Sequence, residues 1–196
     1  TFTPGTRPIP NFGSTNHGNG TLDVRNGGEV AVNDLFVGSG GRLQGNGTIT
    51  GNVTSTGIVA PGNSPGTLHI AGNFTQTGGT IDIEIAGASL FDTIDVTMGV
   101  VLNNVLIRFI FTGGYAPMAG DEYNFLNVGS LFGIDNFDPT YAILGLQSGF
   151  VYDVSNINGA LALNARTNGV AVPEPASLAL FGIGLAGLGF SRRKKA

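Results

Sequence analysis

The stretch Ile49-Thr50-Gly51-Asn52-Val53-Thr54-Ser55-Thr56-Gly57 returns 21 residues later as Ile70-Ala71-Gly72-Asn73-Phe74-Thr75-Gln76-Thr77-Gly78. Upstream, Gly20 and Leu22 return at the same offset as Gly41 and Leu43. A period near twenty residues, with short β-branched runs between glycines, is typical of a β-solenoid, in which each coil buries its inward side chains on its neighbours. The repeat therefore predicts an all-β fold with solenoid coils over residues 21–98, and a β-sandwich with similar hairpins is the alternative.

The runs after the repeat are longer and more apolar. The first, at 100–111, is followed by runs at 122–128, 141–146, 150–154 and 160–163, with Asn158-Gly159 as an expected hairpin turn. We expect the strands of residues 99–165 to pair antiparallel and to cap the open end of the solenoid, because an unpaired last strand is a template for aggregation. Residues 1–20, rich in proline and glycine, predict an irregular entry segment.

Three runs in the body carry a family resemblance: LQGNGTI at 43–49, VAPGNSPGTL at 59–68 and FDTIDV at 91–96. They resemble the β-helix repeats of autotransporter passenger domains and related surface adhesins, and the similarity covers residues 41 to about 128. This resemblance implies a right-handed parallel β-helix, that is, a β-solenoid, followed by a β-rich cap.

The C-terminal residues combine three parts in a fixed order. A rigid polar motif comes first, Val172-Pro173-Glu174-Pro175, whose prolines keep the chain extended. Residues 176–190 carry no charge, and fifteen helical residues reach about 22 Å against a hydrocarbon core of roughly 30 Å. This predicts a C-terminal hydrophobic helix that anchors the chain in a membrane for a limited time, with a buried soluble helix as the alternative. The apolar positions of the anchor are Ala176, Leu178, Leu180, Phe181, Ile183, Leu185, Leu188 and Phe190.

A basic end closes the tail, and its cations favour a C-terminus held on the cytoplasmic side: Arg192, Arg193, Lys194 and Lys195. The Pro-Glu-Pro motif, the apolar run and the basic end together resemble the PEP-CTERM sorting signal of Gram-negative bacteria. The resemblance implies export, recognition of the motif by the membrane protease-transpeptidase exosortase, and removal of the tail. It implies a transient stay in the inner membrane and then delivery to the cell surface, the outer membrane or the extracellular space. We expect residues 166–172 to be the linker to this signal at 173–196.

Composition excludes several classes of function. Residues 1–172 contain five arginines, no lysine and twelve acids, a net charge of −7. An acidic surface without clustered cations argues against nucleic acid as a partner. The absence of cysteine excludes disulfides, thiolate catalysis and Cys-ligated zinc, and His17 and His69 are too far apart in sequence to suggest a zinc site or a catalytic triad. We therefore expect neither a metal nor a cofactor.

Four carboxylates are the strongest candidates for chemistry. Asp82 and Glu84 alternate with isoleucines on one predicted strand, and Asp92 and Asp95 follow closely. Such clusters on β-helices can bind calcium or act on polysaccharides. A solvated strand face explains the alternation as well, and we favour it because charged residues are mostly exposed. On this interpretation the chain has no catalytic residue.

Three further patterns match known sites only formally. Gly62-Asn63-Ser64-Pro65-Gly66 fits the nucleophile elbow, but Pro65 has no N–H to complete an oxyanion hole. The dinucleotide fingerprint at 182–187 lies inside the uncharged run, with no strand before it. Thr54 and Thr75 fall in register and resemble the threonine arrays that order water on ice, although threonine is an ordinary outward residue of a strand.

These features together predict a non-enzymatic protein of the cell surface or extracellular matrix, with a structural or adhesive role in a biofilm. The expected partners are exosortase, the membrane during sorting, and a polysaccharide matrix. A carbohydrate-active β-helix that uses Asp82, Glu84, Asp92 or Asp95 as its acids is the second interpretation. An ice-binding β-solenoid is the third.

Overall fold

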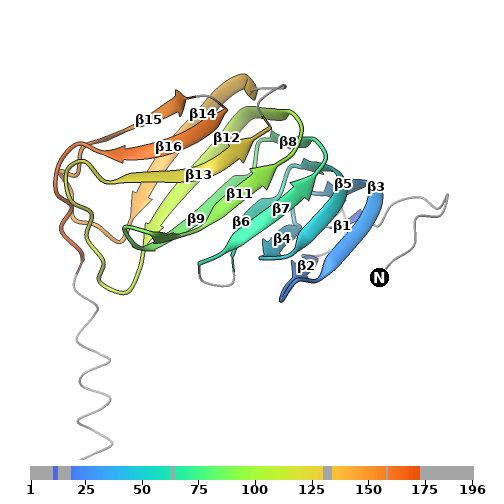
Figure 1. The fold of residues 1–196 in the computed structure, drawn as a ribbon, viewed down its shortest axis with the longest axis horizontal. Coiled ribbons are helices and arrows are strands. Elements are labelled where there is room, and N and C mark those ends of the chain that lie inside the picture. The colour runs from blue at the N-terminus through green and yellow to red at the C-terminus, as the bar shows by residue number, and fades with distance from the viewer. Residues whose placement is uncertain (1–10, 13–18, 63–64, 130–133, 158, 173–196) are drawn as a thin grey trace, which may run out of the picture.

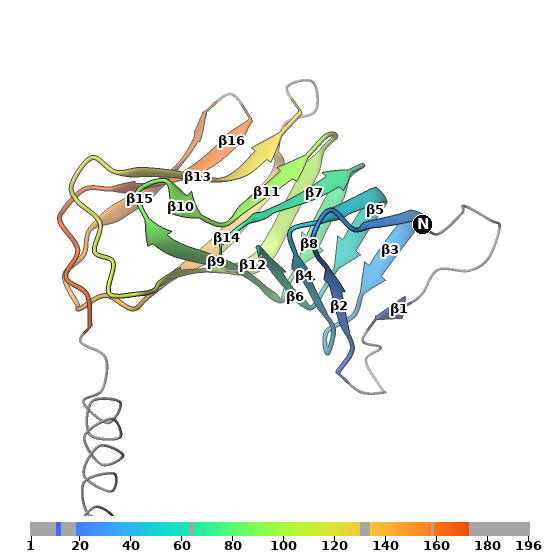
Figure 2. The same ribbon diagram turned by 60° about the horizontal axis from the view of Figure 1, so that its bottom comes forward.

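The computed structural model describes residues 11–12, 19–62, 65–129, 134–157 and 159–172. Within this part of the chain every regular element is a β-strand, which confirms the all-β prediction. The strands belong to one mixed sheet that curves around a common interior (Figures 1 and 2). The expected C-terminal helix lies outside the described residues. The strands are β1 (Asn11–Phe12), β2 (Thr21–Val24), β3 (Glu29–Val37), β4 (Arg42–Gly45), β5 (Thr48–Ser55), β6 (Ile58–Pro61), β7 (Thr67–Ala71), β8 (Phe74–Thr77), β9 (Thr80–Gly87), β10 (Leu90–Phe91), β11 (Thr93–Val96), β12 (Val100–Phe111), β13 (Glu122–Val128), β14 (Ile134–Leu144), β15 (Tyr152–Ile157) and β16 (Ala160–Ala165).

The 21-residue repeat sets the register of the first strands. Parallel pairing places Leu22 beside Leu43, Ile49 beside Ile70 and Thr54 beside Thr75. Each pair joins equivalent positions of the repeat, so the register that the sequence predicts is confirmed. One row of parallel neighbours runs through β2, β4, β6, β9, β12 and β14, while β5 pairs with β7 in its first half and with β8 in its second. The closed, right-handed coil of a solenoid stays a prediction.

Glycines recur in the repeat because neighbouring backbones approach closely there. Gly51 has a φ of 136°, and a Cβ at this position would lie 2.0 Å from the carbonyl oxygen of Val32. A Cβ at Gly72 would lie 2.3 Å from the carbonyl oxygen of Gly51. Only glycine has neither the Cβ nor the strong preference for negative φ. Any other residue at these positions would push two stacked backbones apart.

Asparagines at equivalent positions form a hydrogen-bonded ladder across the same strands. The Asn52 side chain donates to Asp34 Oδ1 at 3.0 Å and accepts the backbone N–H of Asn73 at 3.0 Å. One step further, the Asn73 side chain accepts the backbone N–H of Gly99 at 3.1 Å. These side chains satisfy backbone donors that the strand pairing leaves open at the turns. The recurrence of asparagine in the repeat therefore has a structural cause.

The core lies inside the curved sheet, and in the first strands its side chains are mainly aliphatic. Along β9, Ile81, Ile83 and Ile85 are buried, as the alternation in sequence predicts. Val59 of β6 lies beside Ile81, and Ile107 and Phe109 of β12 lie beside Ile81 and Ile83. Equivalent inward positions thus stack from strand to strand, so the apolar surface of each strand is covered by its neighbours.

The strands of residues 99–165 differ from the predicted antiparallel cap. β12 pairs parallel with β8 and β9 on one side and with β14 on the other, and β11 pairs parallel with β13. The expectation of antiparallel pairing for the run at 100–111 is therefore wrong. β12 follows both β8 and β9 at the same offset of 26 residues, with Val100 beside Phe74 and Leu106 beside Thr80, so the chain returns to the start of this edge before β12 begins and runs in the same direction. Antiparallel pairing is found in the described residues at β13 with β16, β15 with β16 and β9 with β10.

The C-terminal strands are packed by aromatic rings. Phe109 meets Phe125 edge to face with ring centroids 5.0 Å apart, and Phe111 contacts Tyr115, Tyr123 and Phe150. Ile157 pairs with Ala160, so the expected two-residue hairpin connection at 158–159 is confirmed in register, and Gly159 has a φ of 82°. This hairpin lays β15 and β16 against β13 and closes the sheet at the end opposite to β2 (Figure 1).

Candidate functional site

A polar pocket of about 230 Å³ opens on the outer face of the sheet, where β6 is short. Gln44 of β4 pairs with Ala60 of β6, and the next step of the same register places Ala60 beside Asp82 of β9. The small alanine side chain leaves a gap between longer polar neighbours. The pocket is lined by Arg25, Arg42, Gln44, Ala60, Pro61, Gly62, Asp82, Glu84, Asp92 and Ile110.

Asp82 is buried, with 5% of its surface exposed, and it lies between two arginines. Arg108 donates from Nε to Oδ1 at 2.7 Å and from Nη2 to Oδ2 at 2.8 Å, while Arg42 Nη1 is 3.4 Å from Oδ2. The hydrogen bond to Asp82 raises the pKa of Arg108, and such a two-pronged contact fixes both side chains. The predicted solvated strand face is therefore wrong for Asp82, because β12 supplies a cation that covers it.

Asp92 is the most deeply buried acid of the pocket, with 1% of its surface exposed. Its Oδ1 accepts the backbone N–H of Gly66 at 2.8 Å, and its Oδ2 accepts the backbone N–H of Glu84 at 2.9 Å. Burial raises the pKa of Asp92 to about 7 although these two N–H donors act in the opposite direction, and the charges of Glu84 and Asp82 add to the rise. Asp92 can therefore hold a proton near neutral pH.

The polar contacts continue from the pocket to the edge of the sheet. Arg42 Nε donates to Gln44 Oε1 at 2.7 Å, Gln44 Nε2 donates to Asp23 Oδ2 at 2.7 Å, and Asp23 is paired with Arg25. The hydrogen bond from Arg25 lowers the pKa of Asp23.

In the described part of the chain no group of three His, Cys, Asp or Glu side chains is placed to hold a metal ion. The pocket suits hydrogen bonding to hydroxyl groups of a small polar ligand.

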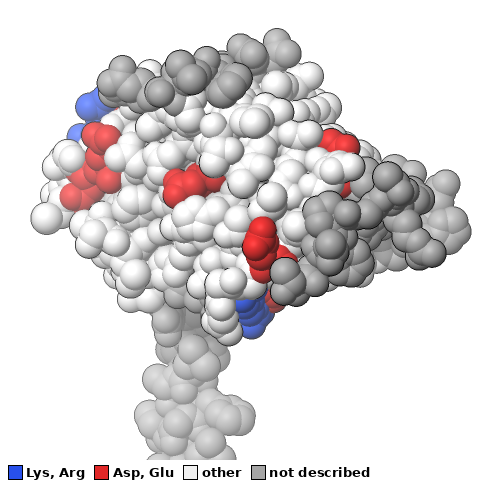
Figure 3. All heavy atoms as spheres, turned by 45° about the vertical axis from the view of Figure 1, so that its right-hand side comes forward, with Lys and Arg blue, Asp and Glu red and all other residues white. Residues whose placement is uncertain are grey.

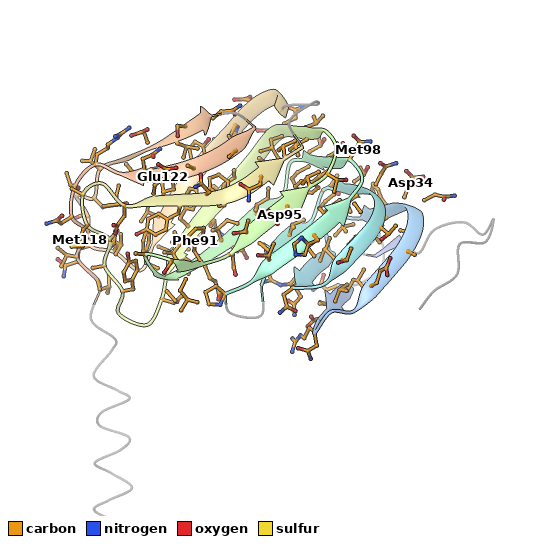
Figure 4. All side chains as sticks on the ribbon, in the orientation of Figure 1. Asp34, Phe91, Asp95, Met98, Met118 and Glu122 are labelled. Atoms are coloured by element: carbon orange, nitrogen blue, oxygen red, sulfur yellow. The ribbon has the colours of Figure 1, made fainter. Side chains whose placement is uncertain are left out.

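Asp95 does not belong to the pocket. It lies on the outer face of β11, where Asn127 Nδ2 donates to its Oδ1 at 2.8 Å and His69 Nδ1 is 3.4 Å from its Oδ2 (Figure 4). The structure thus brings together three of the four candidate acids, Asp82, Glu84 and Asp92. Sequence reasoning missed Arg42 and Gln44 of β4 and Arg108 of β12, because they reach the acids from strands other than β9. The sequence carries a partial indication of the Arg108–Asp82 pair. The two residues lie 26 positions apart, which is the sequence distance between paired strands in this region.

The formal motifs gain no support as sites. Ser64 lies outside the described residues, and the backbone N–H of Gly66 in the same motif is bonded to Asp92. Thr54 and Thr75 pair as expected, but the next residues in their row are Phe36 on one side and Val101 on the other. Among the described strands, the threonine row therefore ends after two members.

The segment that leads into the sorting motif is bonded to the body. Gly169 N donates to Pro117 O at 2.8 Å, Gln147 N donates to Val170 O at 2.7 Å, and Val172 N donates to Gly145 O at 3.0 Å. The division into a linker at 166–172 and a signal at 173–196 stays a prediction. Val172 is exposed, whereas Pro173, Glu174, Pro175, the anchor positions and the basic end lie outside the described residues.

Comparison with known families decides the nature of this C-terminus. Residues 171–194 match the PEP-CTERM protein-sorting motif. The tail carries a PEP-CTERM signal. Such a signal indicates an exported protein that is processed by exosortase, a membrane enzyme, and it implies transit through the membrane to the cell surface or extracellular space.

The comparisons add nothing for the body of the protein. No curated protein and no solved structure matches the chain. The resemblance of residues 41–128 to autotransporter repeats stays a prediction. The described residues contain no helix that is long and apolar enough to cross a membrane. On the face drawn in Figure 3, acidic side chains form small separate groups on a largely uncharged surface.

Proposed function

We propose that this protein is a non-enzymatic structural or adhesive component of the cell surface or extracellular matrix, built on a right-handed parallel β-solenoid and delivered by its PEP-CTERM tail. One observation carries the proposal. Three of the four candidate acids are engaged in holding strands together: Asp82 by Arg108, Asp92 by two backbone N–H groups, and Asp95 by Asn127. Carboxylates bound in this way stabilise the fold and are not free to contact a substrate.

Matrix polysaccharide is the partner that we assign to this scaffold. The outer faces of the strands present asparagine, threonine and acidic side chains, and the described surface holds few cations. Amide, hydroxyl and carboxylate groups on one surface can form hydrogen bonds with many sugar hydroxyls at once, and their combined affinity exceeds that of any single contact.

The test is incubation of the full chain with neutral and acidic polysaccharides, followed by measurement of retained protein and of new reducing ends. We expect retention without new ends. Turnover would contradict the proposal, and Asp92→Asn is the variant that decides whether the pocket causes it. In cells, mass spectrometry of the extracellular protein should show a product without Arg192 to Ala196. A full-length product in a host that has exosortase would contradict processing.

A second function is favoured by one feature of the pocket. Asp92, with a pKa of about 7, accepts the backbone N–H of Glu84, and both acids line the open pocket. A pair of carboxyl groups, one of which carries a proton, is the pairing with which glycosidases work. A carbohydrate-active protein would lose turnover in Asp92→Asn and in Glu84→Gln. A loss in only one of these variants, with turnover kept in the other, would argue against the pair.

A further inference from the structure

The chain leaves the described body at a place rich in exposed apolar side chains. Val170 and Val172 are 56% and 51% exposed, Met118 is 66% exposed, and Val151 is 52% exposed. Large apolar groups gathered at one end of a soluble surface usually mark a contact with a partner or a membrane. We call this set, Met118, Val151, Val170 and Val172, the exit face.

Backbone hydrogen bonds hold these residues together at one end of the molecule. Gly169 is bonded to Pro117, next to Met118, and Asn168 Oδ1 accepts the backbone N–H of Ala119 at 2.8 Å. Val151 O accepts the backbone N–H of Arg166 at 2.8 Å, and Val151 N donates to Thr167 Oγ1 at 2.9 Å. The segment before the tail therefore forms part of the body surface, and the exit face turns with the body as a unit.

The length of chain between the exit face and the anchor is short. Ala176, where the uncharged run begins, is four residues after Val172, and four extended residues span at most about 14 Å. The headgroup layer on each side of a bilayer is roughly 6 Å thick. When the tail is in a membrane, Val172 is held within or directly above that layer, and the bonded exit face is held close to it.

Arg166 and Asp121, two charged groups at this end, already have partners. Arg166 is paired with Asp153, with Nη2 to Oδ2 at 2.9 Å. Asp121 accepts hydrogen bonds from Tyr115 at 3.0 Å and from the backbone N–H of Met118 at 2.9 Å, and the Met118 bond lowers its pKa. A paired or saturated charge at the surface costs less to bring against headgroups than a free one.

We propose that the exit face is a membrane-contacting surface that rests on the lipid headgroups while the tail anchors the protein, with Met118, Val151, Val170 and Val172 entering the interface. The body is then oriented, with the exit face on the bilayer and β2 at the opposite end of the sheet. This inference rests on the anchoring part of the proposed function. Met118 and Met98 lie at opposite ends of the sheet in Figure 4, so they can report on that orientation.

The absence of cysteine makes a direct test simple. Single variants Met118→Cys, Val151→Cys and Val170→Cys of the full chain, with Met98→Cys as the exposed control, receive an environment-sensitive fluorophore and are reconstituted in phosphatidylcholine vesicles that contain spin-labelled lipid. We expect a blue shift and lipid quenching at the exit face and neither at position 98. Equal emission at all four positions would overturn the proposal.

Two further variants separate the possible causes of failure. A label at Leu185→Cys reports whether the tail itself is in the bilayer, and an unquenched label there would overturn both the anchor and the exit-face contact. A quenched tail with an unquenched exit face would overturn only the contact.

Insertion of twelve Gly and Ser residues between Val172 and Pro173, with an average reach of roughly 20 Å, should abolish quenching at position 118 but not at 185. A blue shift without lipid quenching would show that protein covers the face, which also contradicts the proposal.

Discussion

The strands up to β9 and the strands from β11 onward pack in different ways. In the first region, paired strands lie mostly 16 to 22 residues apart in sequence, the core is largely aliphatic, and glycines let backbones touch. In the second, the spacing grows to 26 and then 32 residues, and aromatic rings fill the interior. The glycines of the turns at 113, 114, 120 and 149 have open space around them, but a Cβ at Gly129 or Gly145 would lie 2.2 or 2.0 Å from a neighbouring carbonyl oxygen. Both regions thus use close backbone approach, and the longer repeat adds large aromatic side chains to it.

The aromatic cluster should give the largest loss of stability. Phe109→Ala removes a fully buried ring that contacts Phe125 and Tyr141, and we expect the free energy of unfolding to fall by about 3–5 kcal/mol. Urea unfolding followed by circular dichroism measures the change. Phe36→Ala, at a partly exposed position in the first region, is the control and should cost about 0.5 kcal/mol. Equal losses would mean that the two regions do not differ in their use of aromatic rings.

The next largest effect should come from replacing a glycine that faces a neighbouring backbone, compared with one that faces open space. In Gly51→Ala the new Cβ meets the Val32 carbonyl, and we expect a loss of about 3 kcal/mol from strain and displaced backbone. Gly149→Ala has a similar positive φ, 103°, but no atom within 4 Å, so it should lose only about 1 kcal/mol. Thermal and urea midpoints of both variants give the comparison. A smaller loss at position 51 than at 149 would remove close backbone approach as the basis of the first region.

The junction between the regions should depend on pH through Asp92, which bonds to Gly66 on one side and Glu84 on the other. Its folded pKa of about 7 exceeds the ordinary value of 3.8, so the folded protein binds more protons between these values. Stability from this group is complete below about pH 4 and is lost as the pH rises through 7. We expect the protein to be about 2 kcal/mol more stable at pH 5 than at pH 8 from this group.

Asp92→Asn is the control for this pH effect, because an amide does not titrate in this range. The difference in unfolding free energy between pH 5 and pH 8 should shrink strongly in the variant. Asp23, Asp121 and Asp153, whose pKa values are lowered, act at lower pH and leave this window undisturbed. A difference of unchanged size in the variant would assign the pH dependence to another group.

The asparagine ladder should give the smallest effect. Asn73→Ala removes the acceptor for Gly99 N and one donor to Asn52, and we expect a loss of about 1 kcal/mol. Asn124→Ala, on an exposed position of β13, should change the free energy of unfolding by less than about 0.5 kcal/mol. If both variants unfold at the same urea concentration, the ladder contributes nothing that an exposed asparagine does not.

The repeat could be predicted because stacking requires the same residue types at the same positions. Ile49 and Ile70, or Asn52 and Asn73, show their pairing in the sequence itself. The antiparallel expectation for β12 failed because its long apolar run carries no information about direction, which is set by the return of the chain to the start of the edge that β8 and β9 form. The burial of Asp82 was equally hidden, since Arg42 reaches it from 40 residues away and Arg108 from 26. Asp92 was hidden as well, because its partners are backbone N–H groups with no side-chain signature.

The increase in sequence distance between paired strands has a mechanical consequence. Val172 is bonded to Gly145, directly after β14, and β14 and β2 end one row of paired strands, so a pull between Val172 and β2 runs across the strands and along their hydrogen bonds (Figure 1). Such tension opens neighbouring strands one pair after another instead of shearing all of them together. Each 21-residue unit that opens adds about 70 Å of chain, and each 26-residue unit adds about 90 Å. Under tension, the body would extend in steps of unequal length and absorb work at each step.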